Sequence, residues 1–185
     1  MRWIWIDRIV ELVPARRCVA VKCVSAAEEV LHDHFPATEH HPATPVMPNP
    51  LVIEGMAQTA GILVGHAGGF REKVILAKIA KARFTAAAWP GSVIRYTAEV
   101  ERLDASGAST RGTVELLDPT ARGEGGDGKA EGADAAATAQ PMGEIDLMFS
   151  HIDQNRAGAM FPEENFVFTD PFFELLRRSG VPVPH

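Results

Sequence analysis

The sequence predicts an α+β fold in which a curved antiparallel β-sheet wraps around one long central helix. Residues 51–64 are almost all apolar or small, which is typical of a helix that is buried on every side. Several segments around this run alternate between apolar and polar residues and are separated by turns, as half-buried antiparallel strands are. A chain of 185 residues with 46% apolar content can bury a sizeable core. We therefore expect a single domain over residues 1–185.

The sequence of the N-terminal part predicts two neighbouring strands followed by an irregular segment. Residues 3–13 and 17–25 are rich in β-branched and aromatic side chains, and a proline-containing turn lies between them. Residues 26–31 are short and polar enough to form a connection. Residues 31–44 contain four of the seven histidines, and their prolines argue against a regular element. We expect this histidine-rich loop to deliver side chains to the start of the central helix.

The central helix has recognisable boundaries. Asn49 is a good N-cap, and Pro50 suits the first helical position, where the N–H that proline lacks would have no intrahelical partner. Gly68 and Gly69 predict the end of the helix. The span is too short and too rich in glycine to be interpreted as a membrane crossing.

Two polar side chains, Glu54 and Gln58, interrupt the apolar helix. Their spacing of four places them one above the other on the same side. One interpretation is structural, with the carboxyl group satisfied by Gln58 and the nearby backbone. The other is an acid that burial keeps protonated, so that it can donate a proton during catalysis.

The segments after the helix predict the rest of the sheet. Residues 73–84 form a strand with a basic edge, and residues 92–103 alternate between one apolar and one polar face. Residues 109–117 and 143–152 repeat this alternation. Successive half-buried strands joined by turns indicate an antiparallel sheet.

Two segments lie outside this pattern. Residues 118–141 are rich in glycine and alanine and contain no aromatic side chain, so we expect a flexible excursion within a hairpin. Residues 154–185 form a C-terminal extension that contains a short helix. We expect Asp170 to cap this helix, Pro171 to hold its first position and Gly180 to end it. The apolar residues of that helix need cover from the sheet or from a second subunit.

Composition limits the partners and the compartment. A net charge of −6 argues against nucleic acid as a general partner. The start of the chain lacks the apolar core and the cleavage site of a signal peptide. Cys18 and Cys23 are five residues apart on one predicted strand, so their side chains should point to opposite faces and remain unpaired. We expect a cytoplasmic protein without a cysteine-based metal site.

Three motifs narrow the prediction further: His34-Phe35-Pro36, Pro45-Val46-Met47-Pro48 and the run LVIEGMAQ at residues 51–58. Together they resemble the β-hydroxyacyl-acyl carrier protein dehydratases of the hotdog fold. The likeness covers most of residues 1–117 and the strand that begins at residue 143. It implies a hotdog fold and the dehydration of (3R)-3-hydroxyacyl thioesters to trans-2-enoyl thioesters in fatty acid biosynthesis. Two features differ from the family pattern, because residues 37–44 lengthen a link that is usually short and Asn49 replaces a usual glycine.

The resemblance also implies an active site that two subunits share. His34 of one chain would be the base, and Glu54 on the central helix of the other chain would be the acid. Gln58 matches the glutamine that steadies the carboxyl group. The backbone N–H of Asn49 matches the group that polarises the thioester carbonyl, and the backbone carbonyl of Val46 matches the one that orients the histidine.

These residue types suit the chemistry of dehydration. A neutral imidazole can take a proton from the carbon next to the carbonyl near neutral pH. A protonated carboxyl group can then supply the departing hydroxyl, and a helix N-terminus stabilises negative charge on the carbonyl oxygen. The implied partners are an acyl carrier protein or coenzyme A thioester and a second copy of the chain, in a dimer or a trimer of dimers.

Alternative functions remain open at this point. A hotdog acyl-thioester hydrolase would use a carboxylate on the helix to activate water, but it does not need the histidine base. A catalytically silent acyl-binding or assembly subunit would fit the lengthened loop. A single assay with crotonyl-CoA distinguishes hydration, hydrolysis and binding alone.

Two further groups of residues have alternative interpretations. His32, His40 and His41 could join His34 at a metal ion, but their spacing matches no strong ligand motif, so we expect no metal and no cofactor. A basic group on the strand at residues 73–84 could attract an acidic carrier protein or form an ordinary solvated face; its members are Lys73, Lys78, Lys81 and Arg83.

Overall fold

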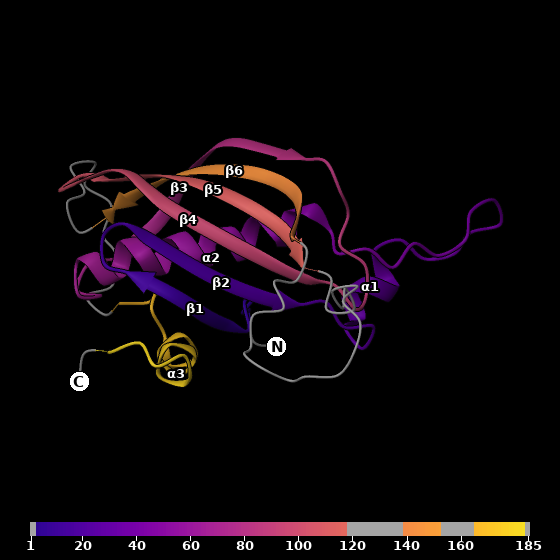
Figure 1. Ribbon diagram of the computed structural model, residues 1–185, viewed down its shortest axis with the longest axis horizontal. Coiled ribbons are helices and arrows are strands. Elements are labelled where there is room, and N and C mark those ends of the chain that lie inside the picture. Colours follow the sequence, from indigo (N-terminus) through magenta and orange to yellow (C-terminus); the bar gives the residue numbers. More distant parts are fainter. Residues whose placement is uncertain (1–2, 118–138, 153–164, 184–185) are drawn as a thin grey trace, which may run out of the picture.

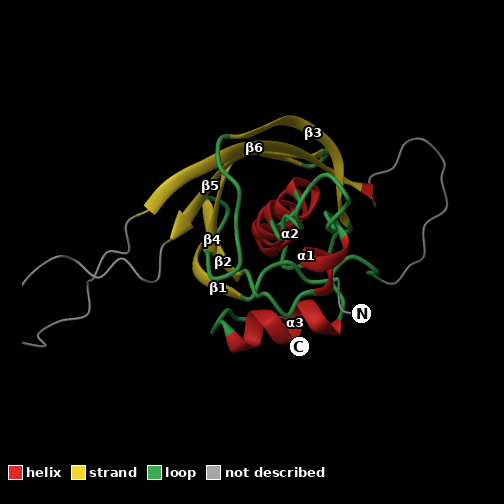
Figure 2. Cartoon of the chain, turned by 90° about the vertical axis from the view of Figure 1, so that its right-hand side faces the viewer, coloured by secondary structure: helices red, strands yellow, loops and turns green. Residues whose placement is uncertain are grey.

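The computed structural model describes residues 3–117, 139–152 and 165–183. Within these residues one antiparallel sheet has the strand order β1-β2-β4-β5-β6-β3. The strands are β1 (Arg8–Val13), β2 (Arg17–Cys23), β3 (Val74–Phe84), β4 (Val93–Asp104), β5 (Gly107–Leu117) and β6 (Ala139–His151). The helices are α1 (Glu29–Asp33), α2 (Asn49–Ala67) and α3 (Asp170–Arg178). The sheet curves around α2, and α3 lies across the side that the sheet leaves open (Figures 1 and 2).

The core lies between the concave face of the sheet and α2. On β4 the side chains of Ile94, Tyr96 and Ala98 are buried, as the alternation predicted. Gly55 of α2 meets this face directly, because a Cβ atom added there would lie 2.4 Å from the hydroxyl oxygen of Tyr96. A residue without a side chain is therefore required where the helix crosses the strand.

The two edges of the sheet differ. Strand β1 contacts α3, whereas most of β3 is exposed along its length. The pairing of β3 with β6 is interrupted by register shifts between Leu76 and Lys78 and between Ile79 and Lys81. Such irregularities bend and twist a strand, so this edge contributes to the curvature of the sheet around α2.

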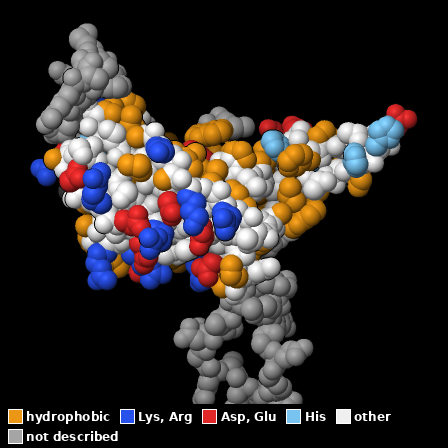
Figure 3. All heavy atoms as spheres, turned by 90° about the horizontal axis from the view of Figure 1, so that it is seen from above, with side chains coloured by type: hydrophobic (Ala, Val, Ile, Leu, Met, Phe, Trp, Pro, Cys, Tyr) orange, Lys and Arg blue, Asp and Glu red, His pale blue; other side chains and the backbone are white. Residues whose placement is uncertain are grey.

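The outer face of the sheet carries charges of both signs (Figure 3). Neighbouring strands place opposite charges together, as in the contact between Arg95 on β4 and Glu115 on β5 at 2.8 Å. Lys81 on β3 pairs in the same way with Glu144 on β6. A face of mixed charge is typical of a solvated surface and gives no broad basic patch for nucleic acid.

Several predicted boundaries at the N-terminal side were wrong. The first strand begins at Arg8 instead of residue 3, because the backbone of Trp3 and Trp5 turns away from the sheet to bond with α2. The predicted connection and loop include the five-residue helix α1, which is too short to show a helical period in the sequence. Helix α2 begins at Asn49 itself, so Pro48 holds the N-cap position that was predicted for Asn49.

The last predicted strand and the C-terminal helix are present, with boundaries that differ from the predicted ones. Strand β6 begins at Ala139, which pairs with Leu117, so residues 139–141 belong to the sheet instead of the expected excursion. Residues 118–138 lie outside the described part of the chain. Helix α3 includes Asp170, and Thr169 takes the N-cap position. Its apolar residues Leu175 and Leu176 are buried within this one chain, so no second subunit is needed to cover them.

The two cysteines lie as predicted on opposite faces of the second strand. Cys18 is buried, Cys23 is exposed, and both thiols are free. Burial raises the pKa of Cys18 to about 12, with a smaller contribution from the negative charge of Glu11. The buried thiol is therefore neutral near neutral pH. No described helix combines the length and apolar character of a bilayer crossing.

Candidate active site

Helix α2 brings Glu54 and Gln58 together as their spacing predicted. The amide nitrogen Nε2 of Gln58 donates a hydrogen bond to Oε1 of Glu54 at 2.8 Å. Gln58 is buried at 6% exposure, whereas Glu54 is half-buried. Because Oε1 of Glu54 accepts this bond, a proton on the carboxyl group would be carried by Oε2.

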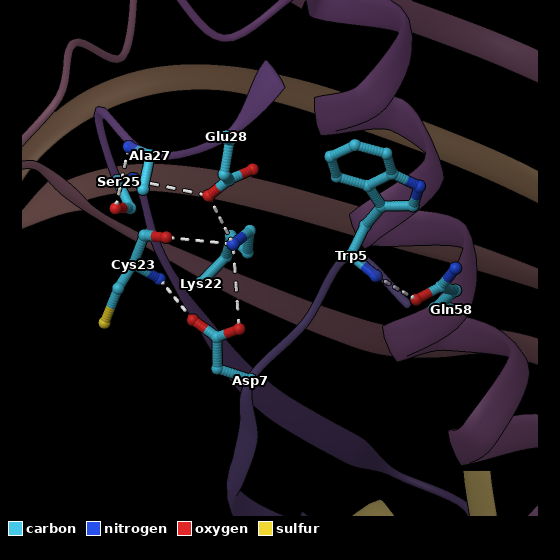
Figure 4. Close-up of polar contacts among 8 residues, drawn as sticks. All are labelled: Trp5, Asp7, Lys22, Cys23, Ser25, Ala27, Glu28 and Gln58. Atoms are coloured by element: carbon cyan, nitrogen blue, oxygen red, sulfur yellow. Dashed lines mark hydrogen bonds and ion pairs between the residues drawn. The ribbon is translucent and has the colours of Figure 1, made fainter. Parts of the chain in front are cut away.

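The N-terminal segment determines how the amide of Gln58 is oriented. The backbone N–H of Trp5 donates to Oε1 of Gln58 at 2.8 Å, and Nε2 of Gln58 also donates to the backbone oxygen of Trp3 at 3.0 Å. Figure 4 shows the Trp5 contact reaching α2 from the chain just before β1. The amide oxygen is held by this backbone, so its nitrogen faces Glu54.

Glu54 lies at the wall of an open cavity of about 330 Å³. One side of the cavity is α2, from Glu54 to Ile62, and another is the start of β3, including Ile75 and Leu76. Apolar and aromatic side chains provide most of the remaining lining, including Phe149 of β6. A carboxyl group beside an apolar hollow can act on a polar group while the hollow holds an apolar chain.

His34 lies apart from this cavity within one chain. It holds the C-cap position of α1, its side chain is exposed, and its ring contacts Phe35 edge to face at 4.3 Å between centroids. The described residues that line the cavity of Glu54 do not include His34. The structure therefore does not bring the predicted base and acid together in a single copy of the chain.

The loop after His34 projects from the body of the protein (Figure 1). Hydrogen bonds close it on itself, from Thr44 N to the oxygen of Phe35 at 3.0 Å and from Thr38 N to the oxygen of His41 at 2.8 Å. Histidine side chains lie along the projection in Figure 3. The lengthened segment at residues 37–44 thus forms an exposed finger instead of packing on its own domain.

A buried lysine fixes the start of α1, the helix that His34 directly follows. The Nζ atom of Lys22 donates to Oε1 of Glu28 at 2.8 Å and to the backbone oxygen of Cys23 at 2.9 Å, and it lies 3.7 Å from Oδ1 of Asp7 (Figure 4). Glu28 is the N-cap residue of α1. The ion pair therefore ties α1 to β2, which limits where His34 can lie.

Val46 and Asn49 lie at the start of α2. Val46 is half-buried and its N–H donates to the oxygen of Thr44 at 2.8 Å, while the next residue, Met47, donates to the oxygen of Ala88 at 2.9 Å. Asn49 is the first residue of the helix. Helix geometry leaves its N–H without an intrahelical acceptor, at the positive end of the helix dipole.

The other histidines of the loop do not form a metal centre with His34 in the described structure. His32 is exposed and its Nε2 atom lies 2.6 Å from the backbone oxygen of Ala26. Within residues 3–117, 139–152 and 165–183, no group of three or more histidine, cysteine, aspartate or glutamate side chains is arranged to hold a metal ion.

Sequence reasoning missed the part of the cavity that the C-terminal segment supplies. Phe166, Val167, Phe168 and Phe172 line it together with α2 and β3. The signal available in the sequence was the concentration of phenylalanines in this segment, but the prediction went only as far as cover of the helix's apolar residues by the sheet or by a second subunit. Periodicity cannot say which distant cavity such residues enter.

Comparisons with known proteins identify the fold class first. The solved dehydratase heterocomplex ApeI:P from Xenorhabdus doucetiae is similar, with a TM-score of 0.52 and 16% identity over 80% of this chain and 83% of that chain. A thioesterase superfamily member from Thermus thermophilus has a TM-score of 0.52 and 15% identity over 76% of this chain and 83% of that chain. At these identities the likeness concerns the fold alone, and it confirms the hotdog fold.

The sequence comparisons then identify the family. Residues 3–117 match the FabA-like domain. The 3-hydroxyacyl-[acyl-carrier-protein] dehydratase FabZ of Pelotomaculum thermopropionicum is 34% identical over 146 residues, which are 78% of this chain and 85% of that protein. FabZ of Chloroflexus aggregans is 39% identical over 102 residues, 53% of this chain and 65% of that protein. The chain belongs to the FabA-like family of 3-hydroxyacyl-[acyl-carrier-protein] dehydratases.

Proposed function

We propose that this chain dehydrates (3R)-3-hydroxyacyl thioesters to trans-2-enoyl thioesters in fatty acid biosynthesis, with His34 of one subunit as base and Glu54 of the other as acid. Membership of the family supports the reaction, since its curated relatives are 3-hydroxyacyl-[acyl-carrier-protein] dehydratases. The observation that carries the assignment is the carboxyl group of Glu54, which Gln58 holds at the wall of an apolar cavity.

In the proposed reaction the two side chains move one proton each. The imidazole of His34 takes a proton from the carbon next to the thioester carbonyl, and the released electron pair forms the new double bond. Oε2 of Glu54 gives its proton to the hydroxyl on the next carbon, which leaves as water. Exchange of protons with solvent then restores the neutral imidazole and the carboxylic acid. Each transfer contributes about 10²- to 10⁴-fold in rate.

The start of α2 has a supporting role in this proposal. The N–H of Asn49 donates to the thioester carbonyl oxygen, where negative charge develops as the proton leaves carbon. Asparagine provides the same backbone donor as the glycine usual in the family. The carbonyl of Val46 accepts a hydrogen bond from His34 and so orients its ring, as matched positions do in the family.

A second copy of the chain is part of the proposed site. Within the part of the chain that the structure describes, β3 is the last strand of the sheet and has one edge without a neighbouring strand. On this strand Leu76 is 38% exposed and Ile79 is 45% exposed. Exposed apolar edges favour pairing with another strand. The same strand lines the cavity of Glu54 through Ile75 and Leu76, so a partner docked there lies beside the cavity. This arrangement supports a dimer with shared sites, on which a trimer of dimers could be built.

The proposed acyl carrier is an acyl carrier protein, and coenzyme A thioesters serve as small substitutes. Exposed Lys78 and Arg83 on β3 offer positive charge to an acidic carrier. Lys81 already pairs with Glu144, and Lys73 is buried, so neither adds a freely accessible charge to this surface. We place the reaction in the cytoplasm, in keeping with two free cysteines.

The test is hydration of crotonyl-CoA, the reverse reaction, by the purified protein and three variants. We expect loss of the enoyl absorbance with the thioester intact. His34→Ala and Glu54→Gln should each reduce kcat by about 10²- to 10⁴-fold. His41→Ala, which changes an exposed histidine of the same loop, should retain activity.

Each other outcome has a defined meaning. Release of free thiol would establish a thioester hydrolase instead. Binding of the thioester without turnover would establish a silent acyl-binding or assembly subunit. Full activity in either His34→Ala or Glu54→Gln would remove that residue from its assigned role.

A further inference from the structure

The C-terminal segment, residues 165–183, lies beyond the region that matches the FabA-like domain, which ends at residue 117. Its first part nevertheless enters the cavity that Glu54 lines. Phe166, Val167, Phe168 and Phe172 form part of its wall, together with residues of α2 from Glu54 to Ile62. Glu54 and Ile62 are eight residues apart, which corresponds to about 12 Å along the helix.

The segment is anchored by specific contacts. Nδ2 of Asn165 donates to the backbone oxygen of Phe70 at 3.0 Å, while Oδ1 of Asn165 accepts from the N–H of Val167 at 3.0 Å. The ring of Phe168 is buried against Gly65 of α2, where an added Cβ atom would lie 2.3 Å from it. Phe168 also meets Phe70 edge to face at 5.0 Å. This wall is therefore packed against the core.

The helix that follows holds the wall in place at its other end. Ser179, directly after α3, accepts a hydrogen bond through Oγ from the N–H of Ile9 on β1 at 2.9 Å. Leu175 and Leu176 bury the inner side of α3. The side chain of Phe172 is part of the cavity lining, whereas that of its neighbour Phe173 packs on Phe70 at 5.6 Å between ring centroids.

We propose that Phe166 and Phe172 limit acyl-chain length by narrowing the apolar part of the cavity with their rings, so that short acyl groups are preferred. This inference rests on the proposed function, because it takes the occupant of the cavity to be the acyl chain of the thioester. The volume of about 330 Å³ is near the lower end of the range for small-molecule sites. The lining beyond Glu54 and Gln58 is apolar and aromatic, which suits a hydrocarbon chain.

The experiment compares Phe166→Ala, Phe172→Ala and the control Phe173→Ala with the unaltered protein. For each, kcat/KM is measured with 3-hydroxybutyryl-CoA and 3-hydroxyoctanoyl-CoA. In the first two variants we expect the octanoyl-to-butyryl ratio to rise about 10-fold, the lower end of what a change of one methylene in an apolar pocket produces. Phe173→Ala should leave the ratio unchanged, because that ring is outside the cavity lining.

Calorimetric titration with butyryl-CoA and octanoyl-CoA gives a readout that needs no turnover. One outcome is that the protein binds the thioesters without dehydrating them, and that the two variants show a higher affinity for octanoyl-CoA relative to butyryl-CoA than the unaltered protein. That result would support the role of Phe166 and Phe172 in the cavity and reject the proposed function. If both variants dehydrate and their octanoyl-to-butyryl ratios of kcat/KM are unchanged, the proposed role of Phe166 and Phe172 is wrong and the proposed function stands. If Phe172→Ala fails to fold by circular dichroism, Phe166→Ala decides the result, since its side chain is 46% exposed.

Discussion

The side-chain amide of Gln58 makes one contact within its own helix and one with a distant part of the chain. Its contact with Glu54 follows from a spacing of four on one helix, which the sequence alone displays. Its contact with the N–H of Trp5 spans 53 positions and fixes which end of the amide faces the carboxyl group. Helical periodicity thus determines that Gln58 lies beside Glu54, and tertiary packing determines how its amide is oriented.

Cys18 provides a prediction at the same scale. Its pKa in the folded protein is raised to about 12 from an ordinary value of 9.0, so the folded state retains a proton that the unfolded chain releases. The contribution to stability is complete below pH 9.0 and is lost as pH rises toward about 12. We expect the free energy of unfolding to fall by up to about 1.4 kcal/mol per pH unit in this window.

The measurement is urea unfolding at several pH values within that window. Tyr96 contributes in the same direction, because burial raises its pKa, aided by the negative charges of Asp7 and Glu28. Cys18→Ala should therefore reduce the slope and leave the part that Tyr96 causes. A Cys18→Ala protein with an unchanged slope would show that this thiol does not carry the effect.

Helix α2 was the element that the sequence predicted best, because nearly every position in its interior is apolar or small. The glycines inside it have different functions that sequence cannot distinguish. An added Cβ atom at Gly55 would lie 2.4 Å from the Tyr96 hydroxyl, whereas at Gly61 the nearest atom would be Cε1 of Phe149 at an ordinary 3.7 Å. One glycine is required by helix-to-strand packing, and the other has room for a methyl group.

This difference predicts opposite effects of the same substitution. Gly55→Ala should lower the free energy of unfolding by about 1–3 kcal/mol, because the methyl group forces Tyr96 to move. Gly61→Ala should be neutral or raise it by up to about 1 kcal/mol, because alanine is the better helix former. Chemical denaturation of both variants is the measurement, and equal effects would contradict the packing argument.

At the scale of the whole molecule, the proposed dimer depends on the two edges of the sheet. Helix α3 contacts β1, whereas β3 pairs with β6 on one side only, and among the described residues no strand covers its other edge, which presents exposed apolar residues. The cavity of Glu54 opens beside β3, and His34 lies elsewhere on an exposed loop. An edge-to-edge dimer is therefore the simplest assembly that adds groups to the site.

Ile79→Lys tests that assembly. A lysine on the free edge opposes strand pairing, so we expect the variant to sediment as a monomer and to lose most dehydratase activity. Val10→Lys is the matched control on the opposite edge, where Val10 is 50% exposed. It should remain a dimer with normal turnover. A monomeric Ile79→Lys protein with full activity would reject a site shared between subunits.

How much the sequence could predict depended on the range of the contacts involved. The alternation of β4, the opposite faces of Cys18 and Cys23, and the Glu54–Gln58 pair all follow from periods of a few residues. The helix α1 was missed because five residues do not establish a period. The departure of Trp3 and Trp5 from the sheet was missed because its cause is hydrogen bonding to Gln58 of α2.

The sequence by itself determined the long buried helix, the half-buried strands and the presence of a carboxyl group beside a glutamine, since local periodicity and residue type are sufficient for these. Tertiary structure decided the strand order β1-β2-β4-β5-β6-β3, the free edge at β3 and the entry of Phe166 and Phe172 into the cavity. Those features come from contacts between distant segments. Which segment packs against an apolar face depends on shape complementarity and on the apolar area buried in the whole fold. The residues of that face alone do not determine it.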